Sequence, residues 1–272
     1  MKKLIIFDLD NTFYNYQSTH EKALNSVFNR QNQYDRKEFI KKYNASKKIV
    51  HKRLGNNPSK HSKLLYFKEM YQNFLNFEEI LNYEYLYWES FINFADISDK
   101  DLKFLKDKKD KEDIFILCTN QNTNIQLLKI SSWNLDMFNF VITSEEVGYE
   151  KPNRNFFQYV VKIIKDFDRN KYNFFAVGDD YENDIKFWKN NYDARSYLID
   201  NSNKRFDEKN NIINTNFQMA LEDIFRERDL IYVKKIRDNF FSLQQLPEIN
   251  GGIVVMDPYT GRVLAMSGGF SF

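Results

Sequence analysis

Short apolar runs and longer segments with helical spacing alternate along most of this chain. Residues 4–7 (LIIF) form one unbroken apolar run, and comparable runs recur further along. Such runs are typical of strands that are buried on both faces of a parallel sheet. The pattern predicts strands over residues 4–7, 113–118, 140–142, 172–177 and 196–200. Strands that alternate with helices in this way predict an α/β fold built on a doubly wound parallel sheet.

Residues 18–94 contain no convincing strand and show only helical spacing of their apolar side chains. Ala23, Val27 and Phe28 fit one helix, and the apolar residues between 64 and 75 fit another. We therefore predict that a helical segment, residues 17–95, is inserted into an α/β core made of residues 1–16 and 96–228. A further helix is predicted over residues 153–166, where Pro152 can open it.

The character of the sequence changes near residue 240. Five of the eight glycines lie beyond residue 250. Residues 253–256 and 262–266 have strand-like patterns and enclose a turn sequence at 257–261, which predicts a β-hairpin. We expect residues 229–272 to form a linker and a short hairpin tail.

Composition and charge argue against several classes of function. The chain has 40 Lys and Arg against 38 Asp and Glu, a net charge of +2, so no global field favours a nucleic acid polymer as partner. No apolar stretch approaches the roughly 20 residues that span a bilayer, and Asp8 ends the first apolar run too early for a signal peptide. The single cysteine, Cys118, is expected to be a buried thiol. We expect a cytoplasmic protein without membrane contact, and the oligomeric state stays open.

Polar side chains with chemical potential follow the predicted strands. Asp8 and Asp10 come directly after the first strand, and residues two apart in an extended chain point the same way. Ligands of open parallel sheets bind at the carboxyl ends of the strands. Two carboxylates that converge there repel each other unless a cation intervenes, and Mg²⁺ is the simplest such cation. The alternative interpretation is a solvated Asp turn.

Four clusters in order give the chain a specific resemblance. They are residues 7–12 (FDLDNT), 118–120 (CTN), 150–152 (EKP) and 177–184 (VGDDYEND). Together they resemble the four ordered motifs of the haloacid dehalogenase-like (HAD) phosphohydrolases, over roughly residues 1–225. The resemblance implies a HAD-like Rossmannoid core and an enzyme of the phosphoric monoester hydrolase type.

The resemblance also implies roles for the three acids of the reacting centre. Asp8 would be the nucleophile that forms an aspartyl-phosphate intermediate. Asp10 would protonate the leaving oxygen and then deprotonate the attacking water. Asp179 would complete a Mg²⁺ site with Asp8 and the backbone carbonyl of Asp10.

Further residues would support this centre. Thr119 and the backbone N–H of Asn120 would bind the phosphoryl oxygens, and Lys151 would offset the negative charge. Asp184 would act behind the metal, holding Lys151 or a metal-bound water. Asp180 stands where similar proteins often have Ser, so its role is open.

Two details narrow the resemblance. Haloacid dehalogenases lack an acid at the position of Asp10, so the chain resembles a phosphatase or phosphotransferase. The insertion between the first two motifs resembles the C1 caps of the family, which implies that substrate choice resides in residues 14–95, with Tyr14 and Tyr16 nearest the phosphate. Residues 8–14 and 148–153 resemble the pyrimidine 5′-nucleotidase-like branch, while sugar phosphates and phosphoglycolate remain open as substrates.

The tail has a different resemblance. Residues 243–272 resemble the start of the transpeptidase domain of class A penicillin-binding proteins and stop before a Ser-x-x-Lys motif would appear. Ser267 and Ser271 lack that motif. We expect a truncated or chimeric gene product whose tail has no activity; the alternative is an ordinary hairpin that docks on the phosphatase.

The leading hypothesis is a Mg²⁺-dependent phosphatase that hydrolyses a small phosphomonoester, possible substrates including a pyrimidine nucleoside monophosphate. A phosphomutase or phosphotransferase would use the same residues and exclude water from the intermediate. Two further hypotheses are a non-catalytic binding module that has kept the fold and an inactive fragment with a cell-wall penicillin-binding-protein tail.

Overall fold

The computed structural model describes residues 2–72, 75–164, 171–200, 205–207, 212–226, 232–237, 240–244, 252–256 and 263–268. Its contacts divide the chain into two compact units, Met1–Phe225 and Arg226–Phe272.

The first unit is built on a seven-stranded sheet with the order β3-β2-β1-β4-β5-β7-β6. Its strands are β1 (Lys2–Phe7), β2 (Ile114–Thr119), β3 (Phe140–Thr143), β4 (Tyr172–Gly178), β5 (Arg195–Ile199), β6 (Arg205–Asp207) and β7 (Ile212–Thr215). All neighbours pair in parallel except β6, which runs antiparallel to β7. The five predicted strands are all present, within two residues at each end, and the predicted α/β class is confirmed.

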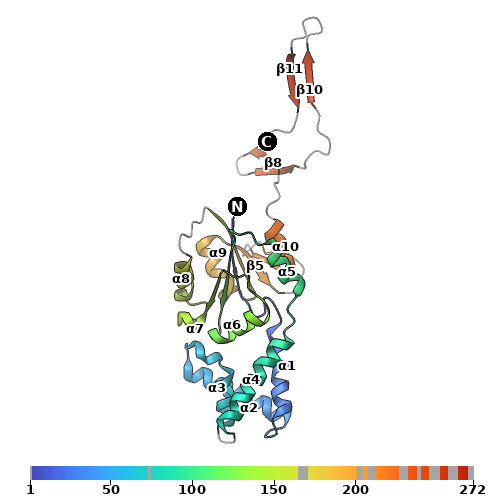
Figure 1. Ribbon diagram of the computed structural model, residues 1–272. Helices are drawn as coiled ribbons and strands as arrows, with labels where there is room; N and C mark the ends of the chain where they lie inside the picture. Colours follow the sequence, from blue (N-terminus) through green and yellow to red (C-terminus); the bar gives the residue numbers. More distant parts are fainter. Residues whose placement is uncertain are drawn as a thin grey trace. The chain divides into compact units, whose positions relative to one another are not determined.

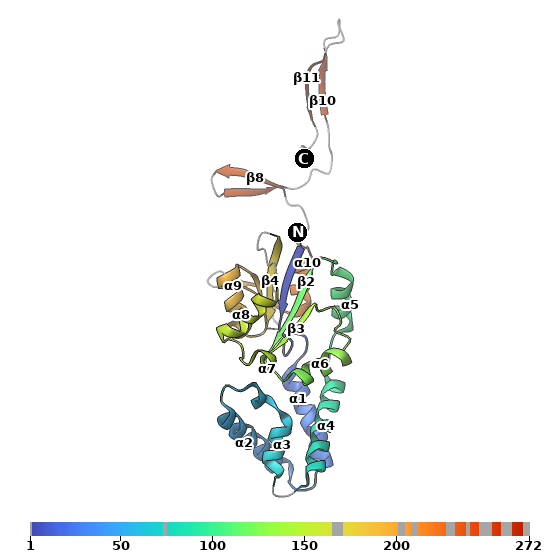
Figure 2. The same cartoon turned by 60° about the vertical axis from the view of Figure 1, so that its left-hand side comes forward.

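Helices cover both faces of the sheet (Figures 1 and 2). Ile5 and Phe7 of β1 pack on one face in a core shared with α5 (Asp99–Lys108) and α10 (Phe217–Arg226). Leu4 and Ile6 point to the other face, into a core shared with α8 (Arg154–Ile163) and α9 (Lys186–Tyr192). Every side chain of this strand beyond Lys3 is therefore buried, as its unbroken apolar run predicts.

The segment between β1 and β2 begins with four α-helices and one 3₁₀-helix. They are α1 (Tyr16–Arg30), α2 (Arg36–Leu54), the 3₁₀-helix η1 (Pro58–His61), α3 (Lys63–Tyr71) and α4 (Phe77–Phe94). Side-chain caps fix their starts, as where Asn76 and Glu79 form a capping box on α4. Figures 1 and 2 both show α1–α4 beyond the carboxyl ends of the strands.

Some helix boundaries differ from the sequence prediction. The helix predicted over residues 64–75 ends at Tyr71, and Asn73 and Phe74 lie outside the described residues. The helix predicted over 153–166 is α8, which ends at Ile163; residues 165 and 166 lie outside the described part. Three short elements lie near the strand ends: α6 (Thr123–Ser132), α7 (Ser144–Val147) and a π-helical turn, η2 (Tyr181–Ile185).

The second unit contains two antiparallel strand pairs. β10 (Gly252–Met256) pairs with β11 (Val263–Gly268), in the hairpin region that the sequence predicts. The turn predicted at residues 257–261, and Ser271, lie outside the described residues. A second pair, β8 (Tyr232–Arg237) and β9 (Phe240–Gln244), was not predicted.

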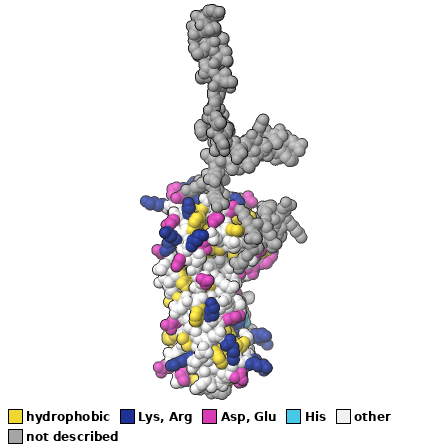
Figure 3. Space-filling model, turned by 90° about the vertical axis from the view of Figure 1, so that its right-hand side faces the viewer, with side chains coloured by type: hydrophobic (Ala, Val, Ile, Leu, Met, Phe, Trp, Pro, Cys, Tyr) yellow, Lys and Arg dark blue, Asp and Glu magenta, His cyan; other side chains and the backbone are white. Residues whose placement is uncertain are grey.

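On the face drawn in Figure 3, basic and acidic side chains are interspersed and do not gather into a patch of one sign. Within the described ranges, no helix is both long enough and apolar enough to cross a bilayer.

Candidate active site

The carboxyl ends of β1, β2 and β4 bring the predicted residues together at one edge of the sheet. Asp8 follows β1, Thr119 ends β2 and Asp179 follows β4. Because β1 lies between β2 and β4, its first acid is flanked on both sides by polar groups of the neighbouring strands. A cleft of about 310 Å³, lined by Asn11, Tyr14 and other residues, reaches Asp179 from one side.

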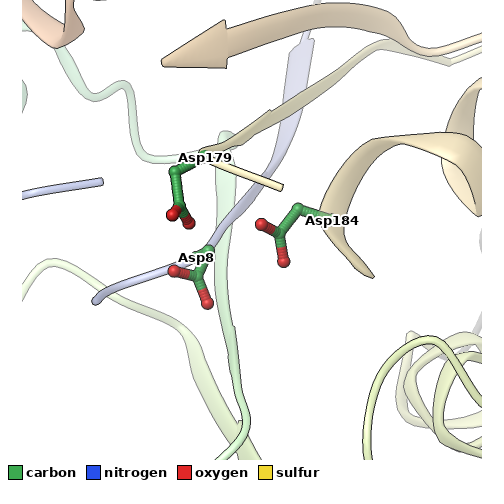
Figure 4. Close-up of side chains that lie close together, drawn as sticks. All are labelled: Asp8, Asp179 and Asp184. Carbon is green, nitrogen blue, oxygen red and sulfur yellow. The ribbon is translucent and has the colours of Figure 1, made fainter. Parts of the chain in front are cut away.

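Three carboxylates converge at this edge (Figure 4). Oxygen atoms of Asp8, Asp179 and Asp184 all lie within 4.8 Å of one another. Gly178 permits this approach, because a Cβ atom at its position would lie 2.4 Å from the Cβ of Asp184. The backbone N–H of Asp180 donates to Asp184 Oδ2 at 3.0 Å and fixes the direction of that carboxylate.

Lys151 forms hydrogen bonds to two of these acids. Its Nζ donates to Asp8 Oδ1 (2.7 Å), to Asp184 Oδ1 (2.5 Å) and to the carbonyl of Cys118 (2.8 Å). Burial alone would lower the pKa of Lys151, but Asp184 and Asp8 outweigh it and raise the pKa above its ordinary value. Lys151 is therefore a fixed positive charge against the side chain of Asp8.

The side chain of Asn120 holds the backbone of Lys151 in place. Its side-chain Oδ1 accepts from the backbone N–H of Lys151 at 2.8 Å, and its Nδ2 donates to the Lys151 carbonyl at 3.0 Å. Thr119 is buried, and its hydroxyl accepts from Gln126 Nε2 at 2.6 Å. The β2 end thus orders the loop that contains the lysine.

The acids carry more negative charge than Lys151 neutralises. Burial raises the pKa of Asp8 well above its ordinary value, and although Lys151 opposes this, Asp184, Asp10 and Asp179 add to it. Burial and the charge of Asp184 raise the pKa of Asp179 to about 6. Carboxylate oxygens are hard donors, so this set fits a divalent cation such as Mg²⁺, which would relieve their repulsion.

Asp10 is not part of the three-acid cluster. Its Oδ1 accepts from Lys129 Nζ at 2.8 Å and from the hydroxyl of Tyr14. Burial favours the neutral acid, but the charge of Lys129 and these hydrogen bonds prevail, so the pKa of Asp10 lies below its ordinary value. The carboxylate that joins Asp8 and Asp179 in the cluster is that of Asp184, which the sequence had placed behind the metal.

Lys129 was missed by the sequence analysis. It is fully buried on α6, where Ile125 and Gln126 are also buried. A lysine four residues from a buried isoleucine lies on the same helix face, and this spacing could have identified it.

The remaining predicted residues lie outside the three-acid cluster. Asp180 caps η2, accepting from the backbone N–H of Asn183 at 3.0 Å, and its side chain is exposed. Tyr16 directs its hydroxyl toward Lys63 of α3, whose Nζ donates to it at 3.2 Å.

The helical insertion also contacts the loop that contains Lys151. Lys60 Nζ lies 2.5 Å from Glu150 Oε2, and His61 Nε2 lies 2.7 Å from Glu150 Oε1. Glu150 directly precedes Lys151, so η1 is held against the loop that brings Lys151 to Asp8.

Comparison with known proteins places these features in a family. The haloacid dehalogenase-like hydrolase model matches residues 2–190. The chain is 28% identical over 193 residues to ribulose-1,5-bisphosphate 5-phosphatase of Halopiger xanaduensis, covering 68% of this chain and 80% of that protein. The chain also has a shorter similarity to penicillin-binding protein 1A of Rickettsia typhi. The two are 45% identical over 53 residues, which cover 20% of this chain and 7% of that protein.

The fold is similar to solved structures of such hydrolases. The magnesium-bound crystal structure of the HAD-hydrolase YfnB from Bacillus subtilis superposes with a TM-score of 0.56 at 17% identity, covering 84% of this chain and 99% of that one. Since the family model spans more than half of the sequence, the chain is a member of the haloacid dehalogenase-like hydrolases.

Proposed function

We propose that this hydrolase is a Mg²⁺-dependent phosphatase that cleaves a small phosphomonoester through an aspartyl-phosphate intermediate. The observation that supports it most is the position of Asp8. Its carboxylate lies at an interior strand end, 2.7 Å from the ammonium of Lys151 and within the cluster that includes Asp179 and Asp184. A nucleophilic carboxylate beside fixed positive charge is what attack on an anionic phosphate requires.

Asp8, Asp179 and Asp184 would hold the metal ion, which supplies positive charge that offsets the negative charge of the phosphate. Lys151 adds a second positive charge, and the Thr119 hydroxyl and the Asn120 backbone N–H would orient the phosphoryl oxygens. An Asp8 oxygen attacks phosphorus, the bond from phosphorus to the ester oxygen breaks, and Asp10 gives that oxygen a proton.

In the second step Asp10 takes a proton from water, the water oxygen attacks phosphorus, and phosphate leaves Asp8. Lys129 and Tyr14 favour the carboxylate form of Asp10, which is the form that this step needs. For the first step we infer that the arriving ester oxygen displaces the Lys129 contact, so that Asp10 can be protonated.

We further propose that α1–α4 act as a C1-type cap, with Tyr14 and Tyr16 on the substrate side. Two substrate classes have support. The resemblance to the 5′-nucleotidase-like branch favours a pyrimidine nucleoside monophosphate, whereas the Halopiger relative, named for a ribulose bisphosphate, favours a sugar phosphate.

The test is phosphate release from a panel of nucleoside monophosphates, sugar phosphates and phosphoglycolate, with Mg²⁺ and with a chelator. We expect Mg²⁺-dependent release, and we expect Asp8→Asn to reduce turnover by on the order of a thousandfold or more, since it removes the nucleophile at constant volume. Asp107→Asn, an exposed position on α5, is the matched control and should behave as wild type. Turnover by Asp8→Asn close to wild type would rule out the covalent route.

A further inference from the structure

Lys63 is a buried lysine that the proposed mechanism does not use. It is the first residue of α3, and only 4% of its surface is exposed. Its ammonium lies among aromatic rings, 5.1 Å from the ring centre of Tyr66 and 5.8 Å from those of Tyr87 and Trp88. Among the residues that the structure describes, no carboxylate forms an ion pair with it.

The hydrogen-bond partners around Lys63 are neutral. Its Nζ donates to the Tyr16 hydroxyl at 3.2 Å, and the hydroxyls of Tyr16 and Tyr87 are hydrogen-bonded to each other. The Tyr87 hydroxyl lies 2.6 Å from His20 Nδ1. Burial raises the pKa of Tyr16, so its hydroxyl does not ionise to an anion near neutral pH. Burial lowers the pKa of His20 to about 3, so this ring is neutral there.

The desolvated ammonium is therefore only partly compensated. Burial lowers the pKa of Lys63 to about 7, and the positive charges of Lys47 and Lys129 add to the effect, while the negative charge of Asp10 opposes it without outweighing it. A charge taken out of water is costly unless an opposite charge meets it, and aromatic rings offset only part of that cost. An anion placed beside Lys63 would remove this penalty and interact strongly in the low-dielectric surroundings.

Lys63 also lies where a substrate would extend from the reacting centre. Lys63 and Lys129 both approach the rings of Tyr16, at 6.0 and 5.9 Å, and of Trp88, at 5.8 and 5.7 Å. Lys129 is in turn paired with Asp10. Lys63 is thus one tyrosine side chain away from the acid that would protonate the leaving group.

The position of Lys63 is fixed relative to the core. Only Ser62 separates it from the end of η1, and Lys60 and His61 of η1 contact Glu150 at 2.5 and 2.7 Å. Glu150 adjoins Lys151, so the loop that contains the catalytic lysine also anchors the segment that contains Lys63.

We propose that Lys63 binds a second anionic group, a phosphate or a carboxylate, on the same substrate molecule whose phosphoryl group reacts at Asp8. The proposal rests on the proposed phosphatase function and specifies its substrate class. It favours sugar bisphosphates and phosphorylated carboxylic acids over nucleoside monophosphates, whose only anionic group is the phosphate that reacts.

Two matched substrate pairs test this. One is a sugar bisphosphate against the monophosphate of the same sugar, and the other is phosphoglycolate against 2-hydroxyethyl phosphate. In the wild type, kcat/KM should favour the member with two anionic groups in at least one pair, by about tenfold or more. In Lys63→Met this preference should fall by about tenfold or more, mainly through KM.

Two variants control for structural effects. Lys63→Arg keeps the charge and should retain most of the preference, whereas Lys68→Met, an exposed position on the same helix, should match wild type. Methionine has the length of lysine and suits aromatic surroundings, so the thermal midpoint of Lys63→Met should not fall.

The outcomes separate the two proposals. In one outcome, phosphate is released from the members with one anionic group, and either the wild type shows no preference or Lys63→Met keeps the preference unchanged. This outcome overturns the role of Lys63 and leaves the phosphatase proposal intact. If no compound is hydrolysed, the phosphatase proposal fails. The role of Lys63 is then tested by calorimetry, which measures the binding of the same compounds to the full-length Asp8→Asn protein. There, adding Lys63→Met should weaken the binding of the member with two anionic groups by about tenfold; equal affinities would refute it.

Discussion

Both oxygens of Asp184 are engaged at once. Oδ1 accepts from Lys151, and Oδ2 accepts from the backbone N–H of Asp180. This arrangement requires the backbone at Gly178 to pass close to Asp184, leaving no room for a side chain. Gly178, which has no reactive side chain, therefore controls the position of Asp184, the acid that would contact both Lys151 and the metal.

Gly178→Ala is expected to reduce kcat/KM by on the order of a hundredfold, because the new Cβ must displace Asp184 from Lys151 and from the proposed cation. Steady-state kinetics over a range of Mg²⁺ concentrations checks this. The contrasting variant is Gly55→Ala. The backbone there has a φ of +56°, and a Cβ atom added at this position would have no other atom within 4 Å. This variant should therefore lower the free energy of unfolding by about 1 kcal/mol and leave the activity unchanged. Unchanged kinetics for Gly178→Ala would show that Asp184 is dispensable.

The sequence could identify residues that follow strands and could not identify buried lysines on helices. Asp8 and Asp179 were recognisable because each directly follows an apolar run. Most lysines in the described helices are exposed, and the sequence alone does not distinguish Lys63 and Lys129 from them. Both ammonium groups approach the rings of Tyr16 and Trp88, and helical spacing alone does not specify this tertiary arrangement.

At the scale of elements, some were predictable and others were not. The five predicted strands were found, while β6 and β7, with three and four residues, were not predicted. α10 was also missed, although Phe217, Ala220, Leu221 and Ile224 are all buried and lie at helical spacing. The insertion was identified as helical, but its division into α1–α4 depends on caps and on packing between aromatic residues.

The helical insertion should make stability sensitive to acid through His20. Its pKa of about 3 in the folded state lies below the ordinary 6.5, because burial disfavours the charged ring. The unfolded chain therefore binds more protons below pH 6.5, so the stabilisation is complete above that pH and is lost as the pH falls toward 3. Between pH 7 and pH 5 the loss amounts to about 2 kcal/mol.

Urea unfolding at both pH values measures this loss. His20→Gln, which does not titrate, should show a pH dependence smaller by about that amount, with the contribution of His51 remaining. If the pH dependence of His20→Gln equals that of wild type, His20 is not kept neutral by the fold.

At the scale of the whole molecule, the chain is similar to two different kinds of known protein. The family model lies within residues 2–190, and the penicillin-binding protein match spans 53 residues, or 7% of that protein. We propose that residues 229–272 form a penicillin-binding-protein-like tail without activity of its own, attached to a phosphatase that is complete without it.

Ending the chain after Arg226 should leave phosphatase activity unchanged and the thermal midpoint unchanged or higher, because the site and both apolar cores lie within Met1–Phe225. Phosphate release and calorimetric melting of the shortened and the full chain test this. A large loss of activity or a much lower midpoint would show that the tail contributes to the folded enzyme.

The position of β1 inside the sheet also has a consequence for biosynthesis. β1 is made first, yet Leu4 pairs with Ile114 on one side and with Phe174 on the other. Contacts between residues so far apart in the chain form slowly, and they cannot form before the partner strands leave the ribosome. The helices α1–α4 pack largely on one another and can settle earlier. Asp8 is thus among the first residues of the site to be synthesised and among the last to reach its place.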